Sequence, residues 1–305
     1  VLKAAQTVYE ERIGIPILIG RKDRIKKLIS ELDLEFSNEL KIIDLSIKKS
    51  KPLIKKYAKI FYNKRKDRGL TLSQAEQLMR RRDYFASMMV KLGEADALIS
   101  GYSRSYPEVI KPILKVIGKA DGVRKVAATN LMITSKGPIF LADTSININP
   151  KYNELGYIAK MTAETAKMFG FQPVVAMLSY SNFGSSNHSM SNKVSAAVKF
   201  IKRSFPDLIV DGPIQSDFAL NREMLRNKFD FSKLAGQRVN ILVFPNLDSA
   251  NITYKVIKEI DGALSIGPII MGMAKPVHIL QLKASVDEII NMSAIAVVDA
   301  QSRNR

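Results

Sequence analysis

A polar segment at residues 245–255 follows a run of apolar residues and has the composition of a ligand-binding loop. The run Val239–Phe244 predicts a buried strand, and the Pro-Asn turn after it leads into a predicted helix that opens with Asp248. In open α/β sheets, polar groups and free backbone N–H donors at the carboxyl ends of strands bind ligands. Helical spacing places Asn251 and Lys255 on one face of that helix. The alternative is an ordinary capped loop in which Asp248 is the N-cap.

Two further loops place small polar residues after predicted strands. Residues 179–187, Ser-Tyr-Ser-Asn-Phe-Gly-Ser-Ser-Asn, directly follow one of these strands. Gly184 lets the backbone approach a ligand, and Ser185 offers a hydroxyl beside N–H donors, so this loop could hold a phosphate or a carbonyl oxygen. It lacks the P-loop spacing of Gly and Lys, and a structural turn is the competing interpretation. Asn130 follows another predicted strand, at 125–128.

The two histidines do not support a catalytic role from their sequence positions. His188 follows the serine-rich loop and could act as a base toward a serine, but no Gly-x-Ser-x-Gly elbow is present. His278 lies between two apolar residues, which favours a structural role. Asp211 and Asp217 flank a Gly-Pro turn and could hold either a substrate group or another loop.

The composition excludes several kinds of site. The 305 residues contain no cysteine, which excludes disulfides, thiolate nucleophiles and cysteine-based zinc sites. With two histidines, a histidine-rich metal site is not expected either. No apolar run is long enough to span a membrane, and the lack of cysteine fits a reducing cytoplasm. The chain begins at Val1 without an initiator methionine or a signal peptide, and we expect it to be a fragment of a longer protein.

The chain is strongly basic, with 47 Lys and Arg against 29 Asp and Glu and a net charge of +18. Much of the excess lies within residues 1–90, in runs such as Arg21–Lys27, Lys64–Arg68 and Arg80–Arg82. A nucleic-acid surface and a site for a multiply phosphorylated small molecule are two interpretations. We favour a third, solvated helix faces, because aromatic residues for stacking single-stranded nucleic acid are not interleaved with the runs.

Short apolar runs alternate with amphipathic segments along the whole chain. Several apolar runs lack a polar alternation, which favours strands buried on both faces of a mostly parallel sheet. The predicted strands are 15–19, 97–100, 125–128, 138–142, 174–178, 208–210, 239–244 and 263–266. The predicted helices are 53–61, 71–92, 152–169, 190–205, 216–226, 249–260 and 285–300, and we assign their Met and aromatic residues to the core. This alternation predicts an α/β fold with right-handed crossovers.

A domain boundary is predicted at the polar stretch 143–150, which follows a strand and ends in a proline. The Gly-Pro pair at 267–268 and the Lys-Pro pair at 275–276 offer a second crossing. The last predicted helix would then return to the first domain and leave the middle segment as an insertion. We therefore predict a discontinuous subdomain of residues 1–145 plus 275–305 and an inserted subdomain of residues 146–274.

Motifs spread over nearly the whole chain point to one family. They are Gly93–Gly101 (GEADALISG), Phe140–Thr144 (FLADT), Leu178–Ser185 (LSYSNFGS), Asp211–Asp217 (DGPIQSD), Pro245–Ile252 (PNLDSANI), Gly267–Gly272 (GPIIMG), Lys275–Leu280 (KPVHIL) and Val297–Gln301 (VVDAQ). Together they resemble the phosphate acetyltransferase family, and most closely the phosphotransacetylase-like C-terminal domain of bacterial NADP-dependent malic enzymes. The resemblance implies two three-layer α/β/α subdomains with mostly parallel sheets.

One part of the family's pattern is missing from this chain. Phosphotransacetylases carry a Ser-Arg pair after the Pro-Val segment and an Asp seven residues beyond that Ser, and the pair positions and stabilises the acyl-transfer centre. The corresponding positions here are Gln281, Leu282 and Glu288. Leucine supplies neither the charge nor the bidentate donors of a guanidinium, and losing one preorganised donor typically raises the barrier by about 2.7–4 kcal/mol. We therefore expect no efficient acetyl transfer and assign no catalytic residue.

The resemblance implies a regulatory domain that binds acetyl-CoA, inhibits a malic enzyme and helps to build its oligomer. On this basis Lys255 and Lys275 would meet phosphate charge, and loop amides would meet the thioester end. The residues expected around acetyl-CoA are Asn130, Ser179, Asn182, Ser185, Asn251, Tyr254, Lys255, Gly267, Pro268 and Lys275.

The same resemblance implies the partners. Malate oxidation, with NADP and a divalent metal (Mg²⁺ or Mn²⁺), would belong to a separate N-terminal malic-enzyme part whose motifs this chain lacks. The expected partners are acetyl-CoA, that N-terminal part and further copies in a homodimer or higher homo-oligomer, with no nucleic acid and no membrane. Two alternatives stay open: a working phosphotransacetylase in which other groups replace the Ser-Arg pair, and a nucleic-acid-binding protein suggested by charge alone.

Overall fold

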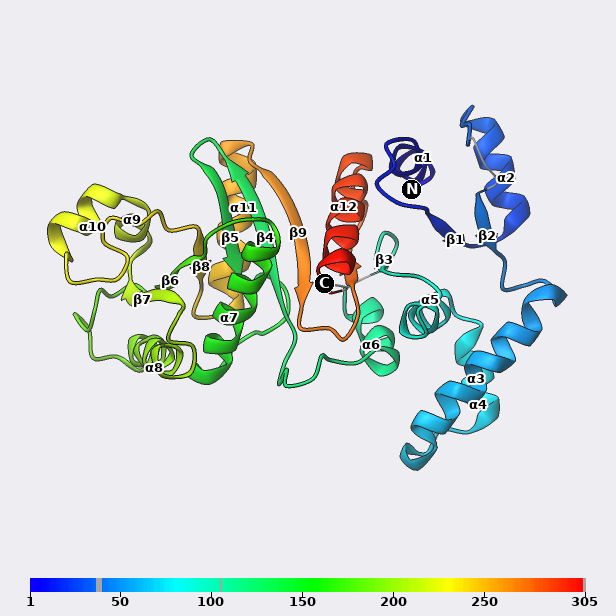
Figure 1. Ribbon diagram of the computed structural model, residues 1–305, viewed down its shortest axis with the longest axis horizontal. Coiled ribbons are helices and arrows are strands. Elements are labelled where there is room, and N and C mark those ends of the chain that lie inside the picture. Colours follow the sequence, from blue (N-terminus) through cyan, green and yellow to red (C-terminus); the bar gives the residue numbers. More distant parts are fainter. Residues whose placement is uncertain (37–39, 105, 304–305) are drawn as a thin grey trace. The chain divides into compact units, whose positions relative to one another are not determined.

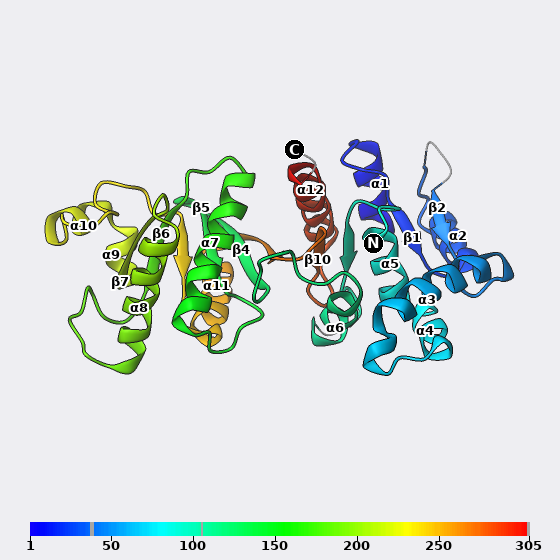
Figure 2. The same cartoon turned by 60° about the horizontal axis from the view of Figure 1, so that its bottom comes forward.

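The computed structural model describes residues 1–36, 40–104 and 106–303, which form two compact units (Figures 1 and 2). Unit 1 comprises Val1–Ala120 and Met273–Arg305, and unit 2 comprises Asp121–Gly272. The first boundary therefore lies before residue 121 instead of after residue 145, because the strands β4 (Ala127–Thr134) and β5 (Gly137–Ala142) pair into the sheet of unit 2. The second boundary lies two residues before the predicted one.

Unit 2 is built on a six-stranded sheet with the strand order β7-β6-β8-β5-β4-β9. Strands β5, β8, β6 and β7 run parallel, and β4 runs antiparallel to both of its neighbours. Strands β6 and β8 are buried over their whole length, as their continuous apolar runs predicted. The remaining strand bounds are β6 (Val174–Leu178), β7 (Ile209–Ile214), β8 (Ile241–Val243) and β9 (Leu264–Met271).

Helices cover both faces of this sheet, which Figure 1 shows with α7 in front of the strands and α11 behind them. Phe140 of β5 stacks on Phe169 at the end of α7, with ring centroids 6.2 Å apart. Its neighbour Leu141 points to the opposite face and joins a core cluster that contains Tyr254 of α11. The helix bounds are α7 (Tyr152–Met168), α8 (Ser189–Ser204), α9 (Ser216–Leu220), α10 (Arg222–Lys228) and α11 (Leu247–Asp261).

Unit 1 contains two short pairs of parallel strands among its helices. Strand β1 (Ile17–Ile19) pairs with β2 (Lys41–Ile43), and β3 (Leu98–Ser100) pairs with β10 (Val277–Ile279). Strands β2 and β10 were not predicted, because each is short and includes a polar residue, Lys41 or His278, so that no continuous apolar run marks it. The helices are α1 (Leu2–Glu10), α2 (Lys22–Glu31), α3 (Lys51–Arg65), α4 (Leu72–Met79), α5 (Arg82–Lys91), α6 (Tyr106–Val116) and α12 (Val286–Ser302), with the 3-10 turns η1 (Lys48–Ser50) and η2 (Lys66–Arg68).

The single helix predicted at 71–92 is two helices, α4 and α5, and the one predicted at 216–226 is also two, α9 and α10. Thr71 caps α4 by accepting a hydrogen bond from the Gln74 N–H at 3.2 Å, and the Gln74 side chain accepts from the Thr71 N–H. The core of unit 1 confirms that the Met and aromatic residues are structural, since Tyr57, Phe61, Met79, Phe85, Met88 and Met89 are buried in one cluster. Within the described residues, no helix is long and apolar enough to cross a membrane.

Candidate functional site

The carboxyl ends of the four parallel strands of unit 2 all carry polar residues. Strand β5 is followed by Asp143 and Thr144, β6 by the serine-rich loop 179–187, β7 by Gln215, and β8 by Asn246. These residues gather at one edge of the sheet, which we call the carboxyl edge. The helices that follow the neighbouring strands β6 and β8 lie on opposite faces of the sheet. Helix α8 packs against α7 on one face, and α11 belongs to the core cluster of the other face. Ligands of open α/β sheets bind at such a divergence.

A chain of hydrogen bonds joins β4 and β9 to α11 at this edge. Asn130 is fully buried; its amide donates to Ser265 Oγ at 3.1 Å, and its Oδ1 accepts from the Thr144 hydroxyl at 2.6 Å. The carbonyl of Thr144 accepts from Asn251 Nδ2 at 3.0 Å. A Cβ at Gly267 would lie 2.8 Å from Asn130 Nδ2, so this position requires glycine. The structure thus brings three predicted site residues together, although both polar atoms of Asn130 are engaged by protein groups.

The serine-rich loop is closed by its own hydroxyls and by the segment after β7. Asn182 Nδ2 donates to Gln215 Oε1 at 2.9 Å, and Asn182 Oδ1 accepts from the Gln215 N–H at 2.8 Å. Ser185 Oγ accepts from the Asn182 N–H at 3.0 Å, and Ser179 Oγ accepts from the Ser181 N–H at 3.3 Å. Asn182 therefore fits the interpretation of a structural turn, whereas the side chain of Ser185 is exposed.

Helix α11 is capped by Asn246 and not by Asp248, because the Ser249 N–H donates to Asn246 Oδ1 at 2.9 Å. Asp248 is exposed in the first turn, where its charge complements the helix dipole. Tyr254 is 4% exposed and belongs to the hydrophobic core, so packing accounts for its position. Lys255 is exposed, and its Nζ lies 5.9 Å from the centroid of the Tyr254 ring. Lys255 therefore presents a positive charge to solvent on this helix.

Asp143 organises the loop after β5 and was not assigned a role from the sequence. Its buried carboxylate accepts hydrogen bonds from the N–H groups of residues 128, 145, 146 and 147, at 3.0–3.2 Å, and from Asn147 Nδ2 at 2.6 Å. Burial raises the pKa of Asp143, and the hydrogen bonds from Ser145, Ile146 and Asn147 oppose that effect. The polar stretch that predicted a domain boundary is therefore folded around one carboxylate.

Two other candidate groups have structural partners. Asp211 accepts from Lys202 Nζ at 2.7 Å and from Ser232 Oγ at 3.0 Å, so it holds another loop, one of the two roles proposed for it. His188 Nδ1 accepts from the Met190 N–H at 3.3 Å and caps α8. This nitrogen is therefore committed to the helix, and we assign His188 no role as a base.

Pro268 lies in β9, next to Gly267, and the other predicted positions lie in unit 1. Lys275 is exposed just before β10, and Gln281 and Leu282 are exposed just after it. The Ser285 N–H donates to Glu288 Oε2 at 2.8 Å, and the Glu288 N–H donates to Ser285 Oγ at 3.1 Å. The carboxylate at the position of the family's Asp thus forms the capping box of α12.

His278 is fully buried on β10, and its Nε2 lies 3.3 Å from Asp299 Oδ2 without hydrogen-bond geometry. Asp299 also pairs with Arg303 at 2.6 Å. Burial raises the pKa of Asp299, but the nearby imidazole and guanidinium outweigh that effect and hold it below its usual range. No group of three or more His, Asp or Glu side chains lies together as metal ligands would in the part of the chain that the structure describes.

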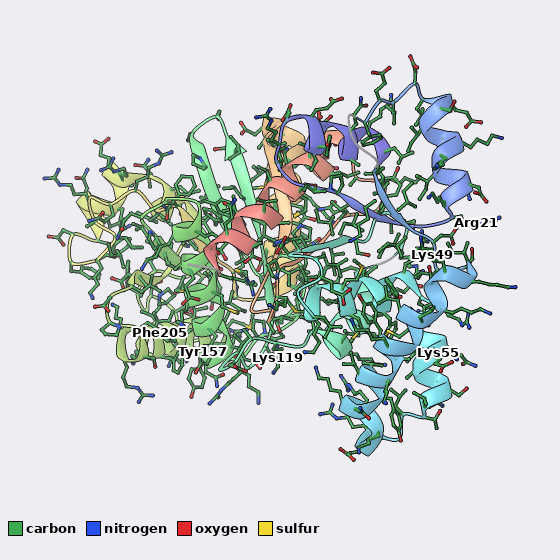
Figure 3. All side chains as sticks on the ribbon, turned by 45° about the vertical axis from the view of Figure 1, so that its right-hand side comes forward. Arg21, Lys49, Lys55, Lys119, Tyr157 and Phe205 are labelled. Carbon is green, nitrogen blue, oxygen red and sulfur yellow. The ribbon has the colours of Figure 1, made fainter. Side chains whose placement is uncertain are left out.

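The basic runs of unit 1 supply exposed charges from several elements. Arg21 and Lys55 lie at its surface (Figure 3). Arg81 and Arg104 instead bind the buried carboxylate of Asp83, at 2.8 Å and 3.1 Å. This cluster was not visible in the sequence, because Arg104 is distant in the chain from the other two residues.

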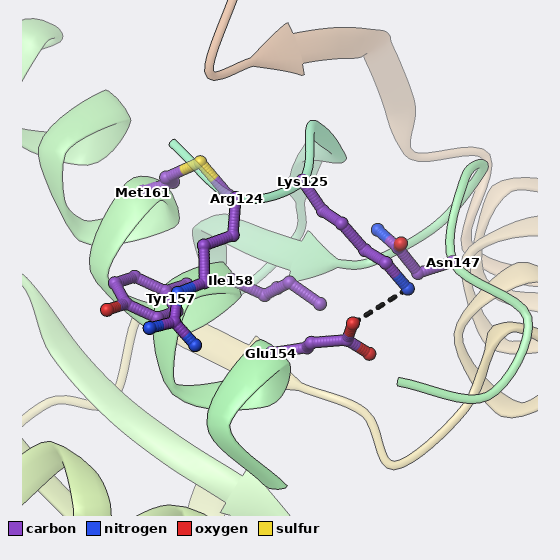
Figure 4. Close-up of a pocket in the computed structure, with 7 residues that line it drawn as sticks. All are labelled: Arg124, Lys125, Asn147, Glu154, Tyr157, Ile158 and Met161. Carbon is purple, nitrogen blue, oxygen red and sulfur yellow. Dashed lines mark ion pairs between the residues drawn. The ribbon is translucent and has the colours of Figure 1, made fainter. Parts of the chain in front are cut away.

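A small hollow in unit 2 contains none of the predicted site residues (Figure 4). Lys125 Nζ pairs with the carboxylate of Glu154 at 2.7 Å, and the Arg124 guanidinium lies 5.8 Å from the centroid of the Tyr157 ring. These charges are engaged with neighbours, so we assign the hollow no ligand. Its lining residues are Arg124, Lys125, Asn147, Glu154, Tyr157, Ile158 and Met161.

The mixed sheet of unit 2, with four parallel strands and helices on both faces, defines an α/β protein. Residues 1–297 match the family model described as phosphate acetyl/butaryl transferase. The chain therefore belongs to the phosphate acetyl/butaryl transferase family.

Two kinds of relative are equally similar in sequence. An NADP-dependent malic enzyme of Escherichia coli (strain K12) is 38% identical over 307 residues, which cover 99% of this chain and 40% of that protein. A phosphate acetyltransferase of Clostridium acetobutylicum is 38% identical over 308 residues, which cover 98% of this chain and 91% of that protein. A solved phosphotransacetylase of Staphylococcus aureus superimposes with a TM-score of 0.89 at 31% identity, covering 98% of this chain and 90% of that one. The predicted family and α/β fold class are confirmed.

Proposed function

We propose that this chain is an acetyl-CoA-binding regulatory and oligomerisation domain of an NADP-dependent malic enzyme and transfers no acetyl group itself. The loop after β10 carries the proposal, because Gln281 and Leu282 stand where the resemblance places a Ser-Arg pair. Leu282 is 58% exposed and apolar, so it offers no fixed cation to a developing negative charge. The match of 99% of this chain to a malic enzyme supports its place as one domain of such an enzyme. Malate, NADP and a divalent metal would then bind to the other domains of that protein.

The carboxyl edge of unit 2 supports the binding of a ligand. Asn251 anchors α11 to the carbonyl of Thr144, and Lys255 lies one helical turn further along the same face. Its ammonium group would meet a phosphate of acetyl-CoA, and the amides of the serine-rich loop would meet the thioester end. Inhibition then requires that acetyl-CoA binds the inhibited assembly more tightly than the active one.

Lys255→Ala is expected to weaken acetyl-CoA binding about tenfold, since one charge-assisted contact is lost. The measurement is isothermal titration of the chain with acetyl-CoA. Lys199→Ala removes an exposed lysine from α8 and is the matched control, which should bind like the wild type. Equal affinities for Lys255→Ala and the wild type would remove the phosphate role of Lys255, and a wild type that binds no acetyl-CoA would refute the whole proposal.

A second candidate function is active phosphate acetyltransferase, which would pass an acetyl group between coenzyme A and phosphate. The similarity to the Clostridium acetobutylicum enzyme over 91% of its length favours it. The two functions predict different turnover, and the loop after β10 is the place to test them.

The proposed oligomer is supported by an apolar stripe on α11. Ile252, Val256 and Ile260 lie four residues apart on one face of the helix and are 61%, 47% and 83% exposed. Contiguous exposed apolar side chains mark interaction surfaces in proteins. We infer that this stripe packs on a second copy of the chain, as in a two-fold symmetric interface.

Val256→Glu is expected to shift the chain to a smaller assembly, because a carboxylate in the centre of an apolar contact is left unpaired. Size-exclusion chromatography with light scattering over a range of concentrations measures the mass. Ser204→Glu places the same charge on the exposed end of α8 and should leave the mass unchanged. A Val256→Glu variant with the wild-type mass would show that the stripe is not the interface.

A further inference from the structure

Three basic side chains converge on the carboxyl end of α6 in unit 1. Lys64 Nζ, Arg65 Nη2 and Lys91 Nζ donate to the carbonyl oxygens of residues 116, 115 and 117, at 3.0, 2.7 and 3.4 Å. The last carbonyls of a helix have no partner inside it, and cations complement its negative end. Lys64 and Arg65 come from the end of α3, and Lys91 is the last residue of α5. Helix α6 therefore ends against cations from two other helices.

Lys64 lies among other cations, namely Lys91, Arg65 and Arg68. Burial, followed by the charges of Lys91, Arg65 and Arg68, lowers the pKa of Lys64 to about 8. At pH 7 roughly a tenth of such amines are neutral, against well under 0.1% for an ordinary lysine. The amine is partly buried, but the residue as a whole is exposed, so a small reagent can approach its side chain. The hydrogen bond to the carbonyl of Val116 uses one N–H and leaves the lone pair of a neutral amine available.

We propose that Lys64 is an acylation site and that the cations around it select an acyl phosphate as the acyl donor. Arg65 would hold the phosphate group, since a guanidinium has five N–H donors and that of Arg65 uses one of them for the carbonyl of Lys115. The charge of Arg68 would add to the attraction. The lysine Nζ attacks the carbonyl carbon of the acyl phosphate. A C–N amide bond forms, the C–O bond to phosphate breaks, inorganic phosphate leaves, and the amine proton passes to water. No electron carrier is needed.

Acylation also suits the folded structure. The product is a neutral amide, so the repulsion from Lys91, Arg65 and Arg68 is removed. The amide keeps one N–H, which can still donate to the carbonyl of Val116. This modification does not depend on acetyl-CoA binding at the carboxyl edge. A chain that binds no acetyl-CoA could still be acylated at Lys64, and the reverse also holds.

The test is to incubate the full chain with acetyl phosphate and to follow the acylation of each lysine by mass spectrometry after digestion with a protease that does not cut at lysine. Lys59 lies exposed on the same helix and is the internal control. Lys64 is expected to react at least about tenfold faster than Lys59 at pH 7, because burial and the neighbouring cations favour the neutral form of the Lys64 amine. Equal rates at the two lysines would overturn the proposal.

Lys91→Gln removes a neighbouring cation and is expected to slow acylation of Lys64 at least about threefold, while Lys59 is unchanged. Lys111→Gln removes an exposed charge from α6 and is the matched control. Arg68→Gln, at an exposed position of η2, provides the same test if the Lys91 variant does not fold. A Lys64 rate unaffected by both substitutions would overturn the role of the cation cluster.

A neutral donor, phenyl acetate, separates the two contributions to this reactivity. The preference for Lys64 over Lys59 is expected to be larger with acetyl phosphate than with phenyl acetate, because the cations attract the phosphate group. Added inorganic phosphate should reduce the preference shown by acetyl phosphate and leave that of phenyl acetate unchanged. The same preference with both donors would overturn the selection of acyl phosphates.

Discussion

Replacing Gln281 with Ser and Leu282 with Arg in one chain is expected to raise acetyl transfer from acetyl phosphate to coenzyme A by at least about a hundredfold. The Arg would supply a fixed cation and a bidentate donor where the wild type has an exposed apolar side chain. Both positions are exposed in the loop after β10, so the substitutions are accommodated without repacking the core. The measurement is the formation of acetyl-CoA in a coupled assay.

Two control variants separate charge from geometry. Leu282→Gln with Gln281→Ser keeps the loop polar but adds no cation and should show no gain. Leu282→Lys with Gln281→Ser adds charge without the guanidinium fork and should gain less than the Arg variant. A wild type that already turns over at about 10 per second would establish the active enzyme instead. A Ser-Arg variant that binds acetyl-CoA but transfers acetyl groups no faster than the wild type would show that the residues of this loop do not account for the lack of activity.

Much of the fold could be predicted from the sequence where apolar runs are long and continuous. The run at 174–178 became β6 with the predicted bounds, and the alternation of strands and helices gave the α/β class. Strands β2 and β10 were missed because Lys41 and His278 leave neither of them a continuous apolar run. The structure does not divide after residue 145, because β4 pairs with β9 and β5 pairs with β8 in the sheet of unit 2. A local polar stretch does not reveal such pairing between distant strands.

The candidate site was predictable as a set of loops but not as a set of contacts. The small polar residues after β6 and β8 do lie at one sheet edge, as their places after strands indicated. The sequence could not show that Asn182 is held by Gln215 or that Asn130 binds Ser265, because each pair is distant along the chain. Composition also could not distinguish Tyr254, which packs in the core, from an exposed ligand residue.

Asp143→Asn is expected to lower the free energy of unfolding by roughly 3–5 kcal/mol, the largest loss among the substitutions considered. Oδ1 of Asp143 accepts from three N–H groups, and Oδ2 accepts from two N–H donors of Asn147. An asparagine side chain must place its NH₂ group where one of the two carboxylate oxygens was. The buried N–H groups that bonded that oxygen would then face another donor and lose their acceptor. Urea unfolding measures the loss, and Asp207→Asn, at an exposed position, should change stability by less than about 0.5 kcal/mol.

The pH dependence of this loss identifies which effect dominates at Asp143. Its pKa is raised in the folded chain above the value of 3.8 for an unburied aspartate, so the folded state holds the proton more tightly. Asp143 then contributes stability that is complete below that value and is lost as the pH rises through the folded pKa. The difference in unfolding free energy between the wild type and Asp143→Asn is therefore expected to grow as the pH falls from 7 toward 4. A difference that shrinks over this range would mean that the five donors outweigh burial and that the carboxylate is held ionised.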